Sequence, residues 1–139
     1  MPAKNVFHDA MIAALQTDGW TITDDPLTLH VGERDLHVDL GAERPFIGAT
    51  KGTDRIAVEV QSFLNPSAVA DLQQAIGQYA MYRVVLAQQQ PDRPVYLAVP
   101  QVVYDGILDE PLGQLMLTEL GLRVIVFDPN RREIVRWIN

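Results

Sequence analysis

Two uninterrupted apolar stretches constrain the fold more than any other feature of this sequence. They are PVYLAVP, residues 94–100, and LRVIVFD, residues 122–128. Strands with one solvated face alternate apolar and polar residues, whereas continuous apolar runs are typical of strands that are covered on both faces. We therefore expect both stretches to lie inside a central sheet that has helices on either side.

Three helices are expected from apolar residues that recur at helical spacing. The first spans residues from about 5 to 18, and the second is a long helix from about 67 to 88 that begins at Asn65 or Ser67 as its N-cap. A third, from about 104 to 120, is interrupted near Pro111 and ends at Gly121. The residues predicted to form the buried face of the long helix are Val69, Leu72, Ile76, Tyr79 and Leu86.

The segment between the first two helices has the alternation of a strand meander. Residues 19–43 read as three strands joined by an Asp-Asp-Pro turn and a Gly-Glu-Arg-Asp turn, and residues 55–63 form the next strand. A last strand is expected at residues 132–138. The order predicts an α/β or α+β fold with a central mixed sheet flanked by helices, and the length of 139 residues favours one domain over residues 1–139.

Composition narrows the possible locations and chemistry. The sequence contains no apolar run of the roughly 18–20 residues that cross a bilayer, and its N-terminus lacks the apolar centre of a signal peptide, so we expect a cytoplasmic protein without membrane contact. The absence of cysteine excludes disulfides and thiolate zinc sites. The net charge of −7 argues against tight nucleic-acid binding by the chain alone.

The stretch IAVEVQSF, residues 56–63, carries two polar side chains in an otherwise apolar strand. Side chains two apart on a strand point to the same face, so Ala57, Glu59 and Gln61 share one face. The rigid backbone thus holds a carboxylate and an amide side by side. This arrangement indicates either a solvated sheet face or the floor of a site.

This chain resembles the PD-(D/E)XK nucleases. Those nucleases have an acidic residue at the end of one strand, then a hairpin, a strand that ends in Glu-x-Lys and a long helix. The chain more closely resembles the XisH family, the fdxN element excision controlling factors, through DGWTITDDP, VDLGAE, IAVEVQSF, DLQQAIGQY, YLAVP and IVRWI. The resemblance implies a restriction-endonuclease-like core and a role in excising a DNA element. It also implies DNA and an XisI-like protein as partners, and self-association is left open.

In that superfamily two carboxylates hold Mg²⁺, a hard cation that takes oxygen ligands. Glu59 would supply one ligand, and either Asp39 or Glu43 the other. A hairpin centred on Lys51 and Gly52 would place residue 59 opposite residue 44 and would favour Glu43. Asp39 ends an apolar strand, as such acids often do, and both remain candidates.

Gln61 departs from the family pattern, because it stands where the superfamily has Lys. An amide lacks the ammonium charge but still orients water through hydrogen bonds. Gln78 and Tyr82 lie at i, i+4 on the long helix and resemble the QxxxY element of related nucleases. His8 stands roughly where related nucleases carry Glu, although a lone helix histidine is more often a surface residue.

Two functions therefore remain open. The first is a Mg²⁺-dependent DNA endonuclease that uses Glu59 with Asp39 or Glu43 as ligands and Gln61 as the group that orients water. The second is a non-catalytic accessory factor that keeps the nuclease fold and acts through DNA or a protein partner. The sequence contains no glycine-rich phosphate loop, so a small-molecule enzyme has little support.

Overall fold

The fold was described from a computed structural model, which covers residues 3–46 and 52–139, with side chains from residue 6 onward. In chain order its elements are α1 (Ala3–Thr17), β1 (Thr21–Asp24), β2 (Leu27–Val31), β3 (Arg34–Val38), β4 (Leu40–Phe46), β5 (Gly52–Val60), α2 (Ala68–Gln89), β6 (Val95–Pro100), α3 (Gln101–Val103), the π-helical segment η1 (Tyr104–Leu108), α4 (Pro111–Glu119), β7 (Val124–Asp128) and β8 (Glu133–Ile138).

A six-stranded mixed sheet in the order β1-β4-β5-β6-β7-β8 forms the centre of the molecule. Strands β5, β6 and β7 are parallel, and the other neighbours are antiparallel. The two continuous apolar stretches of the sequence form β6 and β7, whose residues 95–100 and 124–127 are all buried. The expected mixed sheet with covered central strands is therefore confirmed.

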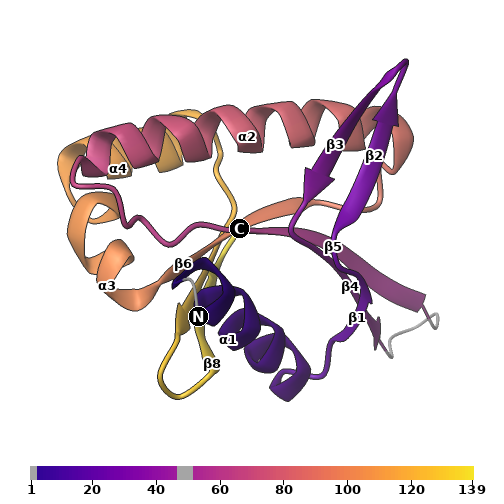
Figure 1. The fold of residues 1–139 in the computed structure, drawn as a ribbon, viewed down its shortest axis with the longest axis horizontal. Helices are drawn as coiled ribbons and strands as arrows, with labels where there is room; N and C mark the ends of the chain where they lie inside the picture. The colour runs from indigo at the N-terminus through magenta and orange to yellow at the C-terminus, as the bar shows by residue number, and fades with distance from the viewer. Residues whose placement is uncertain (1–2, 47–51) are drawn as a thin grey trace.

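The two faces of this sheet carry separate cores (Figure 1). On one face α2 packs Leu72, Tyr79 and Leu86 against residues that include Ala57. On the other face α1 packs against residues that include Val58. The alternation in β5 therefore distributes its side chains between two cores, and Glu59 points to the face that α2 covers.

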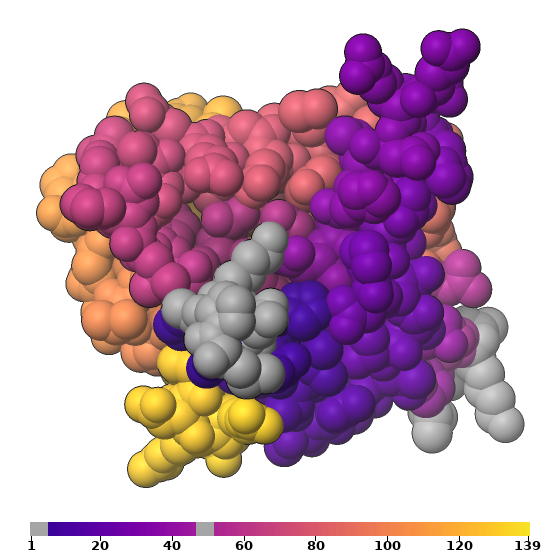
Figure 2. Space-filling model, viewed as in Figure 1, coloured from indigo at the N-terminus to yellow at the C-terminus, as the bar shows by residue number. Residues whose placement is uncertain are grey.

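Strands β2 and β3 form a hairpin that continues beyond the sheet. They pair only with each other, from Leu27 opposite Val38 to Val31 opposite Arg34. Figure 2 shows the tip of this hairpin projecting from the body of the molecule. The base of the hairpin leads directly into Asp39 and β4.

Helix α2 begins where one of the two predicted caps places it. Ser67 is the N-cap, and its hydroxyl accepts a hydrogen bond from the Ala70 amide at 3.2 Å. Asn65 instead accepts from the Ser67 amide. Val69 was expected on the buried face, but it is exposed because it lies in the first turn, beyond the edge of the core.

The predicted helix over residues 104–120 is broken into several pieces. Gly106 leaves helical geometry inside the π-helical segment at φ −90° and ψ −113°, and α4 restarts at Pro111. Gly121 follows α4 with φ +57°, a conformation that glycine adopts without steric cost. The expected interruption near Pro111 and the stop at Gly121 are both present.

The expected register of the β4–β5 hairpin is wrong. A turn centred on Lys51 and Gly52 would place residue 44 opposite residue 59, whereas Arg44 pairs with Asp54 and Leu40 with Val58. The last pair of the described ladder is Phe46 with Gly52, and residues 47–51 lie outside the described residues. The observed pairing differs from the expected one and moves Glu59 toward the other end of β4.

Both outer strands of the sheet are irregular. The register of β1 against β4 shifts between Ile22 and Asp24, and that of β8 against β7 shifts between Val126 and Phe127. Strand β1 has only four residues.

No helix in the described part of the chain is both long enough and apolar enough to cross a bilayer.

Candidate functional site

Asp39 and Glu59 meet at the C-terminal end of β5. Leu40 pairs with Val58, so the same register continued by one residue brings Asp39 opposite Glu59. The Glu59 Oε1 atom accepts a hydrogen bond from the Asp39 amide at 3.0 Å, and Asp39 Oδ2 accepts one from the Val60 amide at 2.8 Å. This reciprocal bonding holds both carboxylates at fixed positions on adjacent segments.

Gln61 lies immediately beyond Glu59 and is held by α2. Its amide Nε2 donates a hydrogen bond to Gln78 Oε1. Its backbone amide donates to the carbonyl of Ala98 at 2.9 Å, which extends the pairing of β5 with β6 past the last strand residue. A helix therefore orients the Gln61 side chain, and the neighbouring strand fixes its backbone.

Tyr82 lies one helical turn after Gln78 and is buried. Its hydroxyl donates to the carbonyl of His37 at 3.0 Å, which ties α2 to the strand before Asp39. Burial raises the pKa of Tyr82 to about 12, and the charges of Glu59 and Asp39 add to this effect. The hydroxyl thus stays protonated and supports the segment that carries Asp39.

Asp39, Glu59, Gln61 and Gln78 border a groove of about 240 Å³ between the end of β5, the loop that follows it and α2, whereas Tyr82 lies outside its lining. Three carboxylates line this groove, those of Asp39, Glu59 and Asp71, and no described lysine, arginine or histidine does. Asp71 was missed by the sequence analysis. It lies in the first turn of α2 and accepts a hydrogen bond from the Asn65 amide at 2.9 Å, so an acid four residues after the N-cap was the available signal.

Glu43 is not brought to this groove. It pairs with Arg55 across the β4–β5 ladder, and its Oε2 atom lies 3.8 Å from Arg55 Nε. It lies four positions after Asp39, a distance of about 13 Å along a strand. Of the two candidates for the partner of Glu59, the structure places Asp39 beside it.

His8 also lies elsewhere. It projects from α1, and its Nε2 atom lies 2.8 Å from Asp25 Oδ1. It is not among the described residues that line the groove. His8 is a partly exposed residue, and its contact with Asp25 connects α1 to the turn after β1.

The carboxylate oxygens of the groove suit a magnesium ion that retains several of its water ligands. Mg²⁺ is commonly bound by one or two carboxylates, with waters and phosphate oxygens completing an octahedron. Asp39 and Glu59 provide two such carboxylates on a rigid strand junction. Among the described residues no group of three or more acids, histidines or cysteines forms a fuller metal cage.

A family model described as XisH protein matches residues 1–135 of the chain. The chain belongs to the XisH family. The family assignment drawn from the sequence blocks is thereby confirmed, and the match spans both the strand that carries Glu59 and the helix that carries Gln78.

Two solved structures are similar to this XisH chain. A crystal structure of an XisH family protein from Nostoc punctiforme PCC 73102 is 38% identical, covers 96% of this chain and 99% of its own, and superposes with a TM-score of 0.87. That of an fdxN element excision controlling factor protein from Anabaena variabilis is 39% identical, covers 97% and 99%, and gives a TM-score of 0.87. No curated protein matches the chain.

Proposed function

We propose that this chain controls the excision of a DNA element through a nuclease-like site formed by Asp39, Glu59 and Gln61, with Mg²⁺ as its cofactor. The observation that carries the proposal is the reciprocal bonding of Asp39 and Glu59 beside the Gln61–Gln78 pair. The excision role itself comes from the family and from the description of the similar Anabaena variabilis protein.

The residues divide the work of such a site among them. Asp39 and Glu59 would hold the cation, and Gln61 would orient a water molecule through its amide, whose position Gln78 fixes. Bound there, Mg²⁺ supplies a Lewis acid that polarises a phosphoryl oxygen and lowers the pKa of a bound water. Tyr82 would act as a positioning residue, since its hydroxyl bonds the strand before Asp39.

The charge of the groove fits a divalent cation better than it fits bare DNA. Three carboxylates and no described cationic side chain line it, so a phosphate would be repelled unless a cation were present. Gln61 adds no positive charge where a lysine would. We therefore expect hydrolysis by the natural chain to be slow.

The test is cleavage of supercoiled plasmid DNA in Mg²⁺ or Mn²⁺, by the chain alone and together with an XisI-like partner. Gln61→Lys should cleave clearly faster than the natural chain, by about 10²-fold, because one preorganised donor to developing charge is typically worth about 10²–10³ in rate. Glu59→Gln should abolish cleavage both in the natural chain and in the Gln61→Lys variant, while it keeps an acceptor for the Asp39 amide.

Gln73→Lys is the matched control. It adds the same charge on the exposed side of α2, away from the groove, so it should not accelerate cleavage. Rapid cleavage by the natural chain that falls in Gln61→Lys would identify the amide as the better catalytic group. If no variant cleaves with or without the partner, the nuclease proposal is wrong.

A second function, that of a non-catalytic accessory factor, is favoured by one specific observation. Both carboxylates already accept a backbone amide, and this bonding stabilises the strand junction whether or not a cation binds. In this case the chain would act by binding an XisI-like protein. Pull-down of that partner should then be unaffected by Glu59→Gln, although plasmid cleavage is absent throughout.

A further inference from the structure

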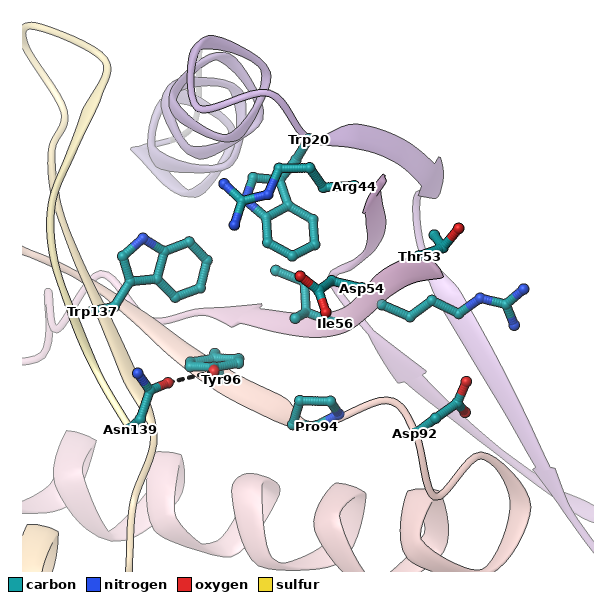
Figure 3. Close-up of a pocket in the computed structure, with 11 residues that line it drawn as sticks. Trp20, Arg44, Thr53, Asp54, Ile56, Asp92, Pro94, Tyr96, Trp137 and Asn139 are labelled. Carbon is teal, nitrogen blue, oxygen red and sulfur yellow. Dashed lines mark hydrogen bonds between the residues drawn. The ribbon is translucent and has the colours of Figure 1, made fainter. Parts of the chain in front are cut away.

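A second and larger cavity lies at the opposite end of β5 from the acidic groove. Its volume is about 600 Å³, and its lining includes residues 53–56 of β5, whereas the groove begins at Glu59 (Figure 3). Neither Asp39 nor Glu59 contributes to it. Any ligand bound here would therefore be independent of the proposed nuclease-like site.

Three aromatic rings from distant parts of the sequence form the wall of this cavity. The rings of Trp20 and Trp137 are 5.8 Å apart between centroids, and Tyr96 meets Trp137 edge-on at 5.2 Å. The Tyr96 hydroxyl donates to Asn139 Oδ1 at 2.6 Å, which fixes this ring against β8. The faces of such rings are electron-rich and attract cations.

One wall already holds a guanidinium group. The Arg44 Cζ atom lies 4.5 Å from the centroid of the Trp20 ring, and Arg44 also pairs with Asp18 at 3.2 Å. Arg55, the other arginine of the lining, pairs with Glu43 at 3.8 Å. Because Asp18 and Glu43 do not line the cavity, both arginines are neutralised by acids outside it.

The two acids of the lining are not neutralised in the same way. Asp54 and Asp92 form no ion pair or side-chain hydrogen bond with the residues that the structure describes. Figure 3 shows the Asp54 carboxylate between the Trp20 and Tyr96 rings. Burial is the main cause that raises the pKa of Tyr96; the charge of Arg123 opposes this rise, and the charge of Asp54 adds a smaller contribution to it.

We propose that this cavity binds an organic cation, a guanidinium or ammonium group of the kind carried by an arginine or lysine side chain or by a polyamine. The cation would lie against Trp137 and Tyr96 with Asp54 as its counter-ion and Asp92 at the rim. An anionic ligand would meet these two carboxylates, while Arg44 and Arg55 of the lining are each already paired with another acid, which disfavours nucleotides and phosphates. The aromatic wall and the acid together are the chemistry of cation recognition.

The chain has two tryptophans, and both line this cavity, so its fluorescence reports on the cavity directly. We expect saturable quenching of the tryptophan fluorescence on titration with N-acetyl-arginine amide. The neutral isostere N-acetyl-citrulline amide should give no saturable response. Spermidine separates the two sources: tighter binding of spermidine indicates a free polyamine, and tighter binding of the arginine amide indicates a protein side chain.

Asp54 is exposed, so Asp54→Asn should weaken binding about fivefold, near the upper end for the loss of an exposed ion pair. Glu119→Gln removes the same charge from the exposed end of α4 and should bind as the natural chain does. Glu59→Gln should also leave binding unchanged, which separates this cavity from the acidic groove. The proposal is overturned if the citrulline compound binds as tightly as the arginine amide, if adenosine monophosphate binds more tightly, or if neither cation gives a response. Calorimetry of Trp137→Leu, which should bind the arginine amide more weakly, checks that the ring contributes.

Discussion

Asp39 and Glu59 each use one carboxylate oxygen to accept an amide from the neighbouring segment. Hydrogen bonds of this charge-assisted kind are stronger than those between neutral groups. The two acids therefore contribute to the stability of the strand junction as well as to the proposed cation site. Replacing Glu59 by Gln rather than Ala keeps the acceptor and changes only the charge, so effects on folding and on function can be separated.

Tyr82 gives a prediction about stability at high pH. Its pKa is about 12 in the folded chain against an ordinary value of 10, so the folded state holds the phenolic proton more tightly than the unfolded state does. The stability that comes from this difference is complete below pH 10 and is lost as the pH rises from 10 to 12. In Tyr82→Phe the free energy of unfolding should fall less over this range.

Urea unfolding at pH 8 and at steps up to about pH 11.5 would measure this difference. At pH 8 Tyr82→Phe should be less stable than the natural chain by about 1 kcal/mol, because the hydrogen bond to the His37 carbonyl is lost. The gap should narrow as the pH rises and reverse towards pH 12, because a pKa raised from 10 to about 12 outweighs one hydrogen bond. A gap that stays constant to pH 11.5 would show that Tyr82 does not titrate in the folded chain with a raised pKa.

The sequence predicted that Glu59 and Gln61 share a face but left the partner of Glu59 open between Asp39 and Glu43. The choice depends on the register of the β4–β5 hairpin, and register is set jointly by the turn and by the side chains that both strands bury. Lys51 and Gly52 resembled the centre of a tight turn, whereas Gly52 already pairs with Phe46 in the ladder. Local turn chemistry could not reveal this, because the buried side chains of both strands decide the pairing.

Among the elements, α2 was the best predicted. Its approximate boundaries and the i, i+4 placement of Gln78 and Tyr82 follow from local sequence, and the structure chooses Ser67 of the two candidate caps. Both side chains lie on the face that meets the sheet. Val69 shows the limit of the pattern, because helical spacing identifies a face but not where the core under that face ends.

Two glycines in helices should respond in opposite ways to alanine. A Cβ atom at Gly113 of α4 would lie 2.1 Å from the carbonyl oxygen of Ile107 and 2.5 Å from Leu108 Cα, which are backbone atoms that cannot move freely. A Cβ atom at Gly77 of α2 would meet nothing within 4 Å. Gly113→Ala should lower the free energy of unfolding by about 3 kcal/mol.

Gly77→Ala should instead raise the free energy of unfolding by about 0.5–1 kcal/mol, because alanine is the better residue in a helix interior. Denaturant unfolding of both variants beside the natural chain is the measurement. Equal stabilities of the two variants would mean that η1 and α4 do not pack as closely as described. The close packing itself was hidden in the sequence, where Gly113 looked like any other residue of a broken helix.

At the scale of the whole molecule, the acidic groove and the aromatic cavity lie at opposite ends of β5. The central strands were predictable from their continuous apolar runs. The aromatic cavity was not, because Trp20 follows the first helix and Trp137 belongs to the last strand, and only the completed sheet brings them together. Such long-range contacts leave no local pattern in a sequence.

Cation binding in the groove should stabilise the whole chain. A ligand that binds only the folded state at ten times its dissociation constant adds about 1.4 kcal/mol to the free energy of unfolding, which raises the midpoint of thermal unfolding by about 3–6 °C for a chain of this size. We expect this rise with Mn²⁺ or Mg²⁺ for the natural chain and for Glu119→Gln.

Glu59→Gln should lose most of this thermal shift, since one of the two carboxylates beside Gln61 is then neutral. The measurement needs no DNA and no partner, so it tests the metal separately from cleavage. A shift of the same size in Glu59→Gln would place the cation elsewhere on the acidic surface.

The irregular outer strands have a consequence for how the molecule behaves in a crowded solution. An exposed, regular strand offers unpaired amides and carbonyls on which another chain can add itself, and that is a route to aggregation. Strand β1 is four residues long with a register shift, and β8 is shifted against β7 and carries the charged residues Glu133 and Arg136. Neither border offers a straight template, so the sheet should end with its own six strands and resist growth into fibrils.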